Sequence, residues 1–382
     1  MVRMYELAVL GAPSQAQIHQ LHEHVARAIA PFGLALDRDV GWHTVPEAFQ
    51  PAQARSAAAV YFGGDAGNTV GLSDLLRNSV PVVPVASELA RVGSELPALL
   101  QPLNCLSWAQ AGAERVATCL LECAGLLPRQ RRVFLSYRRD HARQAALQLF
   151  DALSARQFDV FLDTHGVPPA QDFQSLLWHR LCDSDVLVML DTPGYFDSRW
   201  TSAEFGRALA KGISVLRVGW PDATPSIRTA TASRAELVPD EVDPASGRLA
   251  DAAVDRICQQ LEHVRSESHA IRQLNLVSNV RNAIVSIGGQ FLGVGPHKAI
   301  NLQLPDGKRL VAYPNVGVPT STSLHEAKMN TPDCSVAVVY DSVGLLPAWQ
   351  NHLDWLGSHV RAVQWVKAVE VAWQLADWRD ES

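Results

Sequence analysis

The sequence predicts an α/β protein whose middle part is an open, parallel, flavodoxin-like sheet with helices on both faces. Apolar stretches alternate with stretches of helical periodicity through residues 131–221, and the third expected strand, residues 185–190, holds an unbroken apolar run after Asp185. An unbroken apolar run is typical of a central parallel strand that is covered on both faces. Strands that alternate with helices along the chain are typical of an open parallel sheet.

The first strand and the first helix of this middle part follow one another directly. Residues 133–135 are apolar and lead into the polar tetrad 136–139. Apolar side chains then recur at helical spacing, at Ala146, Leu149, Phe150 and Leu153. One face of this predicted helix should therefore pack against the sheet.

The remaining three strands of the middle part are expected at residues 158–162, 185–190 and 213–218. Before the last of them, Ser198 is a residue typical of a helix N-cap, and Gly212 is typical of a C-terminal stop. We therefore expect a helix between these two residues, and this helix carries Trp200 and Glu204.

Four features, in order along the chain, resemble those of a Toll/interleukin-1 receptor (TIR) domain. They are the first-strand segment 134–139, Asp163 at the end of the second strand, the pair Trp200-x-x-x-Glu204 and the pair Trp220-Pro221. The resemblance is strongest to the NAD-cleaving branch, which is found in bacterial defence proteins and in the animal axon-degeneration NADase. It extends from the first strand of the middle part to a helix that ends near Glu267.

The resemblance implies a catalytic role for Glu204 in cleaving NAD+. It implies substrate binding by Ser136, Tyr137, Arg138, Asp163 and Trp200. NAD+ is then a substrate, and neither a cofactor nor a metal is implied. The loop 163–172 departs from the family, because it holds no Lys or Arg where related NADases often carry a base. The resemblance therefore gives no support for phosphate contact from this loop.

The pair Trp200 and Glu204 also suits this chemistry by residue type. Residues four apart on a helix lie on one face, and this face is expected beyond the carboxyl end of a central strand, where open α/β sheets bind ligands. An indole ring can stack on a nicotinamide ring, and a carboxylate can stabilise the oxocarbenium-like charge that forms as a glycosidic bond breaks.

Each of these residues also has a purely structural interpretation. The helix dipole alone favours a Glu near the start of a helix, Trp200 can be an aromatic residue at the rim of the core, and Arg138 can be a solvated surface residue. The sequence leaves both interpretations open.

Length and composition predict two or three domains in a cytoplasmic protein. The chain has 382 residues, of which 47% are apolar and 19% charged, enough to bury substantial cores. A net charge of −6 argues against direct nucleic-acid binding through a broad basic surface. No apolar run approaches the ~20 residues of a membrane span, and six cysteines without metal-site spacing indicate reduced core thiols.

Residues 1–128 are expected to form a degenerate TIR-like or nucleotide-binding-like α/β domain before the TIR domain, residues 129–268. Residues 34–37 parallel the second strand of the middle part, but residues 71–76 carry no Trp-x-x-x-Glu pair. The glycine-rich stretch 63–69 can present backbone N–H groups to an anion or form a simple loop.

Residues 272–382 are expected to form a smaller α/β domain that senses a signal or docks a partner. Pro305-Asp306-Gly307 between two apolar runs predicts a hairpin. Five tryptophans in the last 34 residues are interpreted as core residues, with nucleotide stacking or partner docking as the alternatives. Residues 222–248 are interpreted as a loop or an insertion, followed by the last helix of the middle part, from Leu249 to about Glu267.

The resemblance therefore implies a TIR-domain NAD+ hydrolase that acts as a regulated effector in prokaryotic antiphage defence. Its products are nicotinamide and ADP-ribose, and self-association of TIR domains is expected to activate it. A protein or small-molecule trigger is expected at the N- or C-terminal domain, and no membrane partner is expected. Two alternatives stay open: a TIR cyclase that makes a cyclic ADP-ribose signal, and a non-catalytic TIR interaction or adaptor protein.

Overall fold

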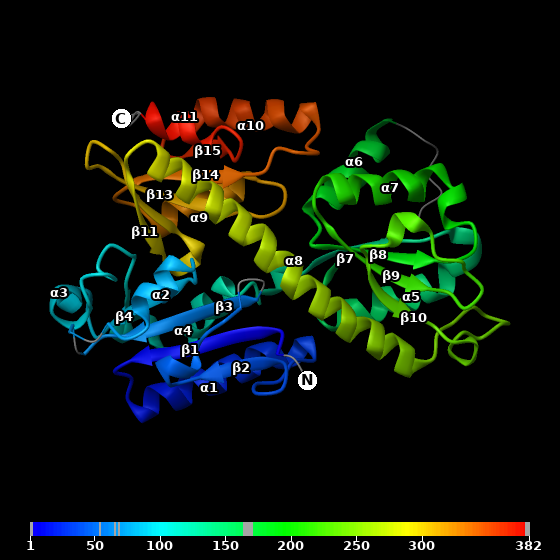
Figure 1. The fold of residues 1–382 in the computed structure, drawn as a ribbon, viewed down its shortest axis with the longest axis horizontal. Helices are drawn as coiled ribbons and strands as arrows, with labels where there is room; N and C mark the ends of the chain where they lie inside the picture. The colour runs from blue at the N-terminus through cyan, green and yellow to red at the C-terminus, as the bar shows by residue number, and fades with distance from the viewer. Residues whose placement is uncertain (1–2, 53–54, 65, 68, 163–170, 379–382) are drawn as a thin grey trace. The chain divides into compact units, whose positions relative to one another are not determined.

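The computed structural model describes residues 3–378 apart from 53–54, 65, 68 and 163–170 (Figure 1). Contacts divide the chain into two units. The first unit holds the described residues up to 127, residues 270–342 and those from 348 on, and the second holds residues 128–269 and 343–347. The division into domains at 1–128, 129–268 and 272–382 stays a prediction.

The first sheet of the first unit is parallel throughout, with the strand order β2-β1-β3-β4-β5. Its strands are β1 Tyr5–Gly11, β2 Val40–His43, β3 Ser56–Phe62, β4 Val82–Ala86 and β5 Leu106–Ser107. Its helices are α1 Gln15–Ile29, α2 Leu72–Arg77, α3 Val92–Glu95 and α4 Trp108–Cys123. The α/β architecture predicted for this part of the chain is confirmed.

The second strand of this sheet begins later than predicted. Residues 34–37 do not form it, because the chain turns tightly there: Asp37 has a φ of 62°, and the Asp39 carboxylate accepts the N–H of Ala35 at 2.9 Å. Such local side-chain to backbone bonds compete with strand pairing. The strand is instead Val40–His43, which pairs with β1.

The second sheet of the first unit has the strand order β11-β12-β13-β14-β15, in which β12 is antiparallel to both β11 and β13, and the pairs β13–β14 and β14–β15 are parallel. These strands are β11 Gln290–Val294, β12 Ile300–Gln303, β13 Arg309–Asn315, β14 Ser335–Tyr340 and β15 Gln364–Lys367. The predicted hairpin is confirmed, since β12 and β13 are antiparallel and Gly307 in their turn has a φ of 87°.

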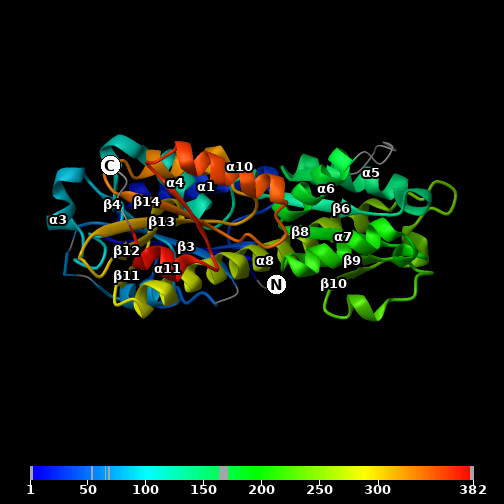
Figure 2. The same ribbon diagram turned by 90° about the horizontal axis from the view of Figure 1, so that it is seen from above.

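Helices cover both faces of this sheet. They are α9 Ser321–Asn330, α10 Pro347–His359 and α11 Val371–Ala376, with the C-terminal half of α8 Asp251–Ser286. One core layer joins α8 and α11 to the sheet, and another joins α9 to its opposite face. Figure 2 shows α8 and α11 on one side of β13 and β14, and α10 on the other.

The loop between β11 and β12 packs against α4 through a charged pair. Nδ1 of His297 lies 2.5 Å from Oε2 of Glu122. Both His297 and Lys298 have positive φ values, 56° and 61°, and Lys298 is buried. Burial lowers the pKa of His297, but the Glu122 carboxylate outweighs that effect, so the pKa is raised above its ordinary value.

This pair makes the stability of the first unit sensitive to alkaline pH. A raised pKa stabilises the fold fully below the unfolded value, about 6.5, and that stabilisation is lost as pH rises through the folded pKa. We expect the free energy of unfolding to fall by about 1.5 kcal/mol between pH ~6 and ~9, the value of a hydrogen bond to a charged group. Urea titrations at both pH values measure this fall. Glu122→Gln should flatten it, and an equal fall in that variant would contradict the prediction.

The sheet of the second unit is parallel throughout, in the order β10-β9-β8-β6-β7. Its strands are β6 Arg132–Ser136, β7 Asp159–Leu162, β8 Val186–Asp191, β9 Ser214–Gly219 and β10 Ser233–Glu236. Its helices are α5 Arg139–Ala155, α6 Gln171–Asp183, α7 Arg199–Ala210 and residues 251–269 of α8. The open parallel sheet predicted for the middle of the chain is confirmed.

Two predictions at the end of this unit are wrong. The stretch 222–248, interpreted as a loop, contains the edge strand β10, which pairs with β9. The last helix continues past Glu267 to Ser286, because no glycine or proline interrupts it and apolar side chains recur as far as Ile284. It ends shortly before Gly288, which has a φ of 85°.

Two apolar layers sandwich this sheet. One layer joins alternate strand residues to α5 and α8, and the other joins the intervening residues to α6 and α7. Figure 1 shows α6 and α7 on one side of the sheet and α5 with α8 on the other. Side chains at successive strand positions therefore enter opposite cores.

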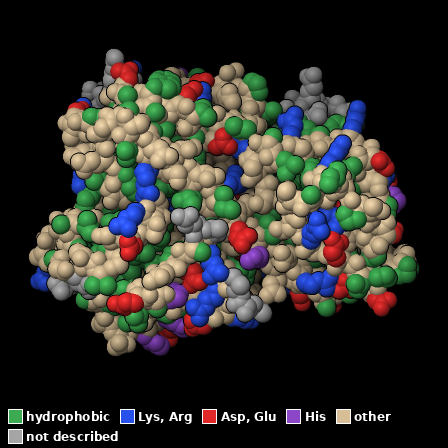
Figure 3. All heavy atoms as spheres, viewed as in Figure 1, with side chains coloured by type: hydrophobic (Ala, Val, Ile, Leu, Met, Phe, Trp, Pro, Cys, Tyr) green, Lys and Arg blue, Asp and Glu red, His purple; other side chains and the backbone are tan. Residues whose placement is uncertain are grey.

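Surface features of the described residues bear on several of the sequence predictions. Trp355 and Trp373 are 56% and 61% exposed, so the core interpretation is wrong for these two. None of the six cysteines, which all lie among the described residues, forms a disulfide bond, and four of them are buried. Among the described helices, none has the length and hydropathy needed to span a membrane. On the face shown in Figure 3, basic and acidic side chains are intermixed.

Candidate active site

The site lies at the carboxyl end of the parallel sheet of the second unit. Strands β6 and β8 are neighbours, and Ser136 pairs with Met189 at the end of β6. The chain leaves β8 at Asp191, turns through residues 192–198 and enters α7. Open parallel sheets bind ligands at this edge.

Helix α7 begins as the sequence predicts. The side chain of Ser198 accepts a hydrogen bond from the N–H of Trp200 at 3.3 Å, so Ser198 is the N-cap. Trp200 and Glu204 lie one turn apart, but they differ in exposure. The indole is 36% exposed and the glutamate only 8%. The guanidinium of Arg199 lies 4.7 Å from the centre of the Trp200 ring.

The carboxylate of Glu204 is held by a hydroxyl group from β6. Ser136 Oγ lies 2.5 Å from Glu204 Oε2 and donates its hydrogen to it. The same Ser136 Oγ lies 2.6 Å from the phenol oxygen of Tyr195. Tyr195 is 1% exposed and Ser136 2% exposed. The structure thus brings together two predicted site residues and a third that the sequence analysis did not identify.

The backbone around Tyr195 fixes this arrangement. Gly194 has a φ of 74°, a value that favours glycine. A Cβ at Gly194 would collide with Nη1 of Arg138. The hydroxyl of Thr201, on α7, donates to the carbonyl of Tyr195. The Tyr195 ring packs edge-on against Phe196, with ring centres 5.2 Å apart.

Electrostatics keep the Tyr195 phenol protonated. Burial raises its pKa well above the ordinary value, and the nearby charge of Glu204 raises it further. Both effects disfavour a second negative charge beside the carboxylate. At neutral pH the phenol is therefore a neutral hydrogen-bond donor.

The other predicted site residues are placed differently. Arg138 donates to the carbonyl oxygens of Pro193 at 3.2 Å and Gly194 at 3.0 Å, so it braces the turn after β8. Tyr137 is 8% exposed and belongs to the α5 and α8 core, on the face of the sheet opposite Ser136. Asp163 lies outside the described residues. Substrate binding by Ser136, Tyr137, Arg138, Asp163 and Trp200 stays a prediction, as does the catalytic role of Glu204.

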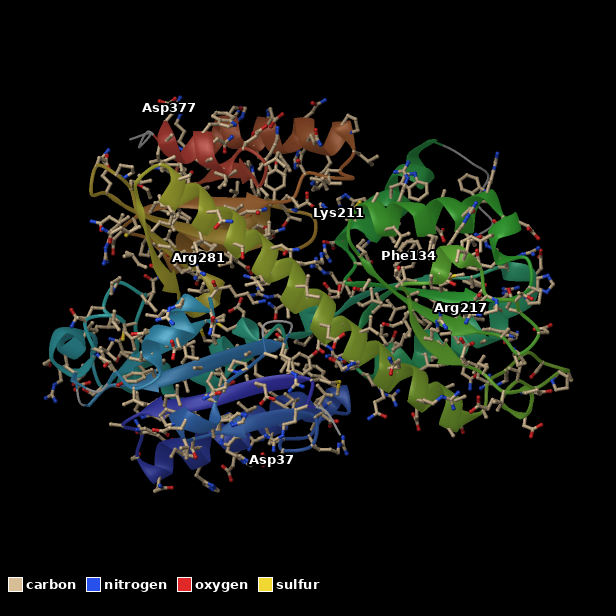
Figure 4. All side chains as sticks on the ribbon, viewed as in Figure 1. Asp37, Phe134, Lys211, Arg217, Arg281 and Asp377 are labelled. Carbon is tan, nitrogen blue, oxygen red and sulfur yellow. The ribbon has the colours of Figure 1, made fainter. Side chains whose placement is uncertain are left out.

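A buried charged group at the same edge of the sheet was also missed by the sequence analysis. Arg217 on β9, labelled in Figure 4 with Phe134 on β6, is 1% exposed. Its Nε lies 2.5 Å from Asp191 Oδ2, and its Nη1 lies 2.5 Å from Glu236 Oε1. Burial raises the pKa of Asp191 despite the Arg217 charge. The sequence did hold a signal for this buried ion pair: an arginine stands inside the apolar strand β9, and the neighbouring strand β8 ends in an aspartate.

An open hollow of about 400 Å³ lies between α5 and the start of α8. It is lined by Gln148, Asp151, Ala152, Arg248, Asp251, Val254 and Asp255. None of the predicted site residues that the structure describes lines this hollow. Among the described residues, no group of three His, Cys, Asp or Glu side chains could hold a metal ion.

Comparison with known protein families gives a match in the middle of the chain. Residues 133–245 match the family model of the TIR domain. No curated protein matches the chain. Among solved structures, the chain is 13% identical to tagatose-6-phosphate ketose/aldose isomerase from Escherichia coli, over 70% of this chain and 83% of that one. The TM-score is 0.20, too low to support any conclusion.

Proposed function

We propose that the TIR domain of this protein hydrolyses NAD+ to nicotinamide and ADP-ribose, with Glu204 as its catalytic carboxylate. The observation that carries the proposal is the Glu204 carboxylate at the carboxyl edge of the sheet, held by the Ser136 hydroxyl at 2.5 Å. This edge is where parallel sheets bind ligands. The TIR match covers both residues.

The chemistry follows from the charge that develops during bond cleavage. The bond between the nicotinamide nitrogen and C1′ of the ribose breaks, and its electron pair leaves with nicotinamide. The ribose then carries oxocarbenium-like charge, which an ionised carboxylate stabilises. A water molecule forms the new bond to C1′, and its proton is released. No cofactor is needed, because NAD+ is the substrate.

We also propose that the protein is a cytoplasmic, regulated effector of prokaryotic antiphage defence. An NAD+ hydrolase that was always active would deplete its own cell, so activity must depend on a signal. In this proposal, self-association of TIR domains activates the enzyme, and the first unit receives a protein or small-molecule trigger. Cysteines without disulfide bonds, as all six are among the described residues, are typical of a reducing compartment.

One observation favours a second candidate, a TIR interaction module without catalysis. Glu204 is 8% exposed, so the carboxylate has little free surface through which to reach a ribose. In this alternative Glu204 only ties α7 to β6. The two candidates differ in whether nicotinamide is ever released.

Incubation of the purified full chain with NAD+ tests the proposal. Nicotinamide and all ADP-ribose products are quantified together by chromatography, with and without a crowding agent that promotes self-association. We expect nicotinamide and linear ADP-ribose in equal amounts, with faster release under crowding. A cyclic product would identify a cyclase. No nicotinamide from concentrated, self-associated protein would favour the interaction module.

A further inference from the structure

We propose that Tyr195 and Ser136 are positioning residues, which form a hydrogen-bond chain that fixes the orientation and the ionised state of Glu204. This inference rests on the proposed function only in taking Glu204 as the reacting carboxylate. Two distances define the hydrogen-bond chain: Tyr195 Oη lies 2.6 Å from Ser136 Oγ, and Ser136 Oγ lies 2.5 Å from Glu204 Oε2.

The donors and acceptors of the three side chains set the direction of the hydrogen bonds between them. An ionised carboxylate only accepts hydrogen bonds, so Ser136 donates its one hydrogen to Glu204. Ser136 then has no hydrogen left for Tyr195. The Tyr195 phenol must therefore donate to Ser136. Two hydroxyl groups in series then point their hydrogens toward the carboxylate, an arrangement that favours the ionised form of Glu204.

Burial makes this arrangement effective. Tyr195, Ser136 and Glu204 are 1%, 2% and 8% exposed. In such surroundings hydrogen bonds are electrostatically stronger than in water and polarise one another. Losing one member leaves a buried polar group without its partner.

The helix that carries Glu204 also holds Tyr195 in place. Thr201, three residues before Glu204 on α7, donates its hydroxyl hydrogen to the Tyr195 carbonyl. The Tyr195 ring belongs to the same apolar cluster as Phe205, the residue after Glu204. Movement of the phenol relative to the carboxylate is therefore restricted from both sides.

Hydrogen bonds to the charged form of a carboxyl group favour that form, so each donor in this hydrogen-bond chain favours ionised Glu204. Tyr195→Phe removes the terminal donor, and Ser136→Ala removes the direct one. Both changes should raise the pKa of Glu204. Activity that needs the ionised carboxylate is present above this pKa and lost below it, so the acidic limb of the kcat profile should move to higher pH.

The experiment measures kcat and KM of the full chain for NAD+ across the pH range, under the conditions that activate the parent. Well below the pKa, raising the pKa by about 1 lowers the ionised fraction about 10-fold. We expect kcat of Tyr195→Phe to fall about 10-fold on the acidic limb and to recover toward the parent value at higher pH. KM should change little. Ser136→Ala should move the limb further, and Ser136→Thr, which keeps a hydroxyl group, should retain most of the parent profile.

Tyr340→Phe is the matched control, since Tyr340 is another buried tyrosine, 1% exposed, on β14. Its kcat profile should follow that of the parent. An active Tyr195→Phe variant whose acidic limb coincides with the parent's would overturn the inference and leave the proposed function standing.

A second measurement does not require turnover. Infrared titration of the carboxylate band, with the spectrum of Glu204→Gln subtracted, gives the pKa of Glu204 directly. A parent without NAD+ cleavage would end the proposed function, yet the pKa of Glu204 should still rise in Tyr195→Phe. An unchanged pKa would overturn the hydrogen-bond chain itself.

Discussion

Glu204→Gln is expected to lower the rate of NAD+ cleavage about 100-fold or more, the effect of removing one preorganised electrostatic group from a transition state. Glutamine keeps the shape of the side chain and can still accept the Ser136 hydrogen bond through its amide oxygen. The change therefore removes the negative charge and little else. Nicotinamide release under activating conditions is the measurement.

A matched variant separates this effect from a general loss of charge. Glu267 lies on α8 in the same unit, its side chain is 50% exposed, and it faces His263 at 3.4 Å. Glu267→Gln should cleave NAD+ as the parent does. If Glu204→Gln keeps the parent rate while both variants are folded by circular dichroism, Glu204 is a structural residue and the assignment fails.

Regular features of the fold could be predicted because they depend on local pattern. The unbroken apolar run before Asp191 is a central strand, β8, and Pro305-Asp306-Gly307 is a hairpin turn. The N-cap at Ser198 is also local. In each case a few neighbouring residues determine the structure.

Features that depend on distant residues could not be predicted in the same way. β10 is short and half exposed, so its pairing with β9 leaves no strong apolar pattern. Tyr195 stands in a turn, and only its distance to Ser136 gives it a role. Ser136 and Tyr137 are adjacent in sequence, yet the strand alternation sends them to opposite faces.

Glu262→Ala is expected to lower the free energy of unfolding of the second unit by about 3–5 kcal/mol, the cost of removing one partner from a buried ion pair. Glu262 lies on α8, and its two carboxylate oxygens accept hydrogen bonds from Nη1 and Nη2 of Arg131 at 2.9 and 2.7 Å. Arg131 is fully buried, with its guanidinium 4.1 Å from the ring of Phe158. Without the carboxylate, this charge loses its bidentate partner inside the protein.

The neighbouring charged residues do not compensate for the loss of the Glu262 carboxylate. Arg265, also fully buried, lies 3.6 Å from Glu262 and 3.3 Å from Asp185. Burial raises the pKa of Asp185, but His269, Arg265 and Arg132 outweigh it and hold the pKa well below its ordinary value. Asp185 is thus already ionised and cannot supply a further charge for Arg131. Arg265 would keep its contact with Asp185, whereas Arg131 would lose its ion pair with Glu262.

Urea titration followed by circular dichroism measures the change in the free energy of unfolding. Two further variants serve as controls. Glu267→Ala, exposed on the same helix, should stay within about 0.5 kcal/mol of the parent. The double variant Arg131→Met with Glu262→Met removes both charges and should recover most of the loss, because apolar residues of similar volume replace buried ion pairs at little cost. Should the double variant be as unstable as Glu262→Ala, the loss comes from packing at α8 and not from an uncompensated charge.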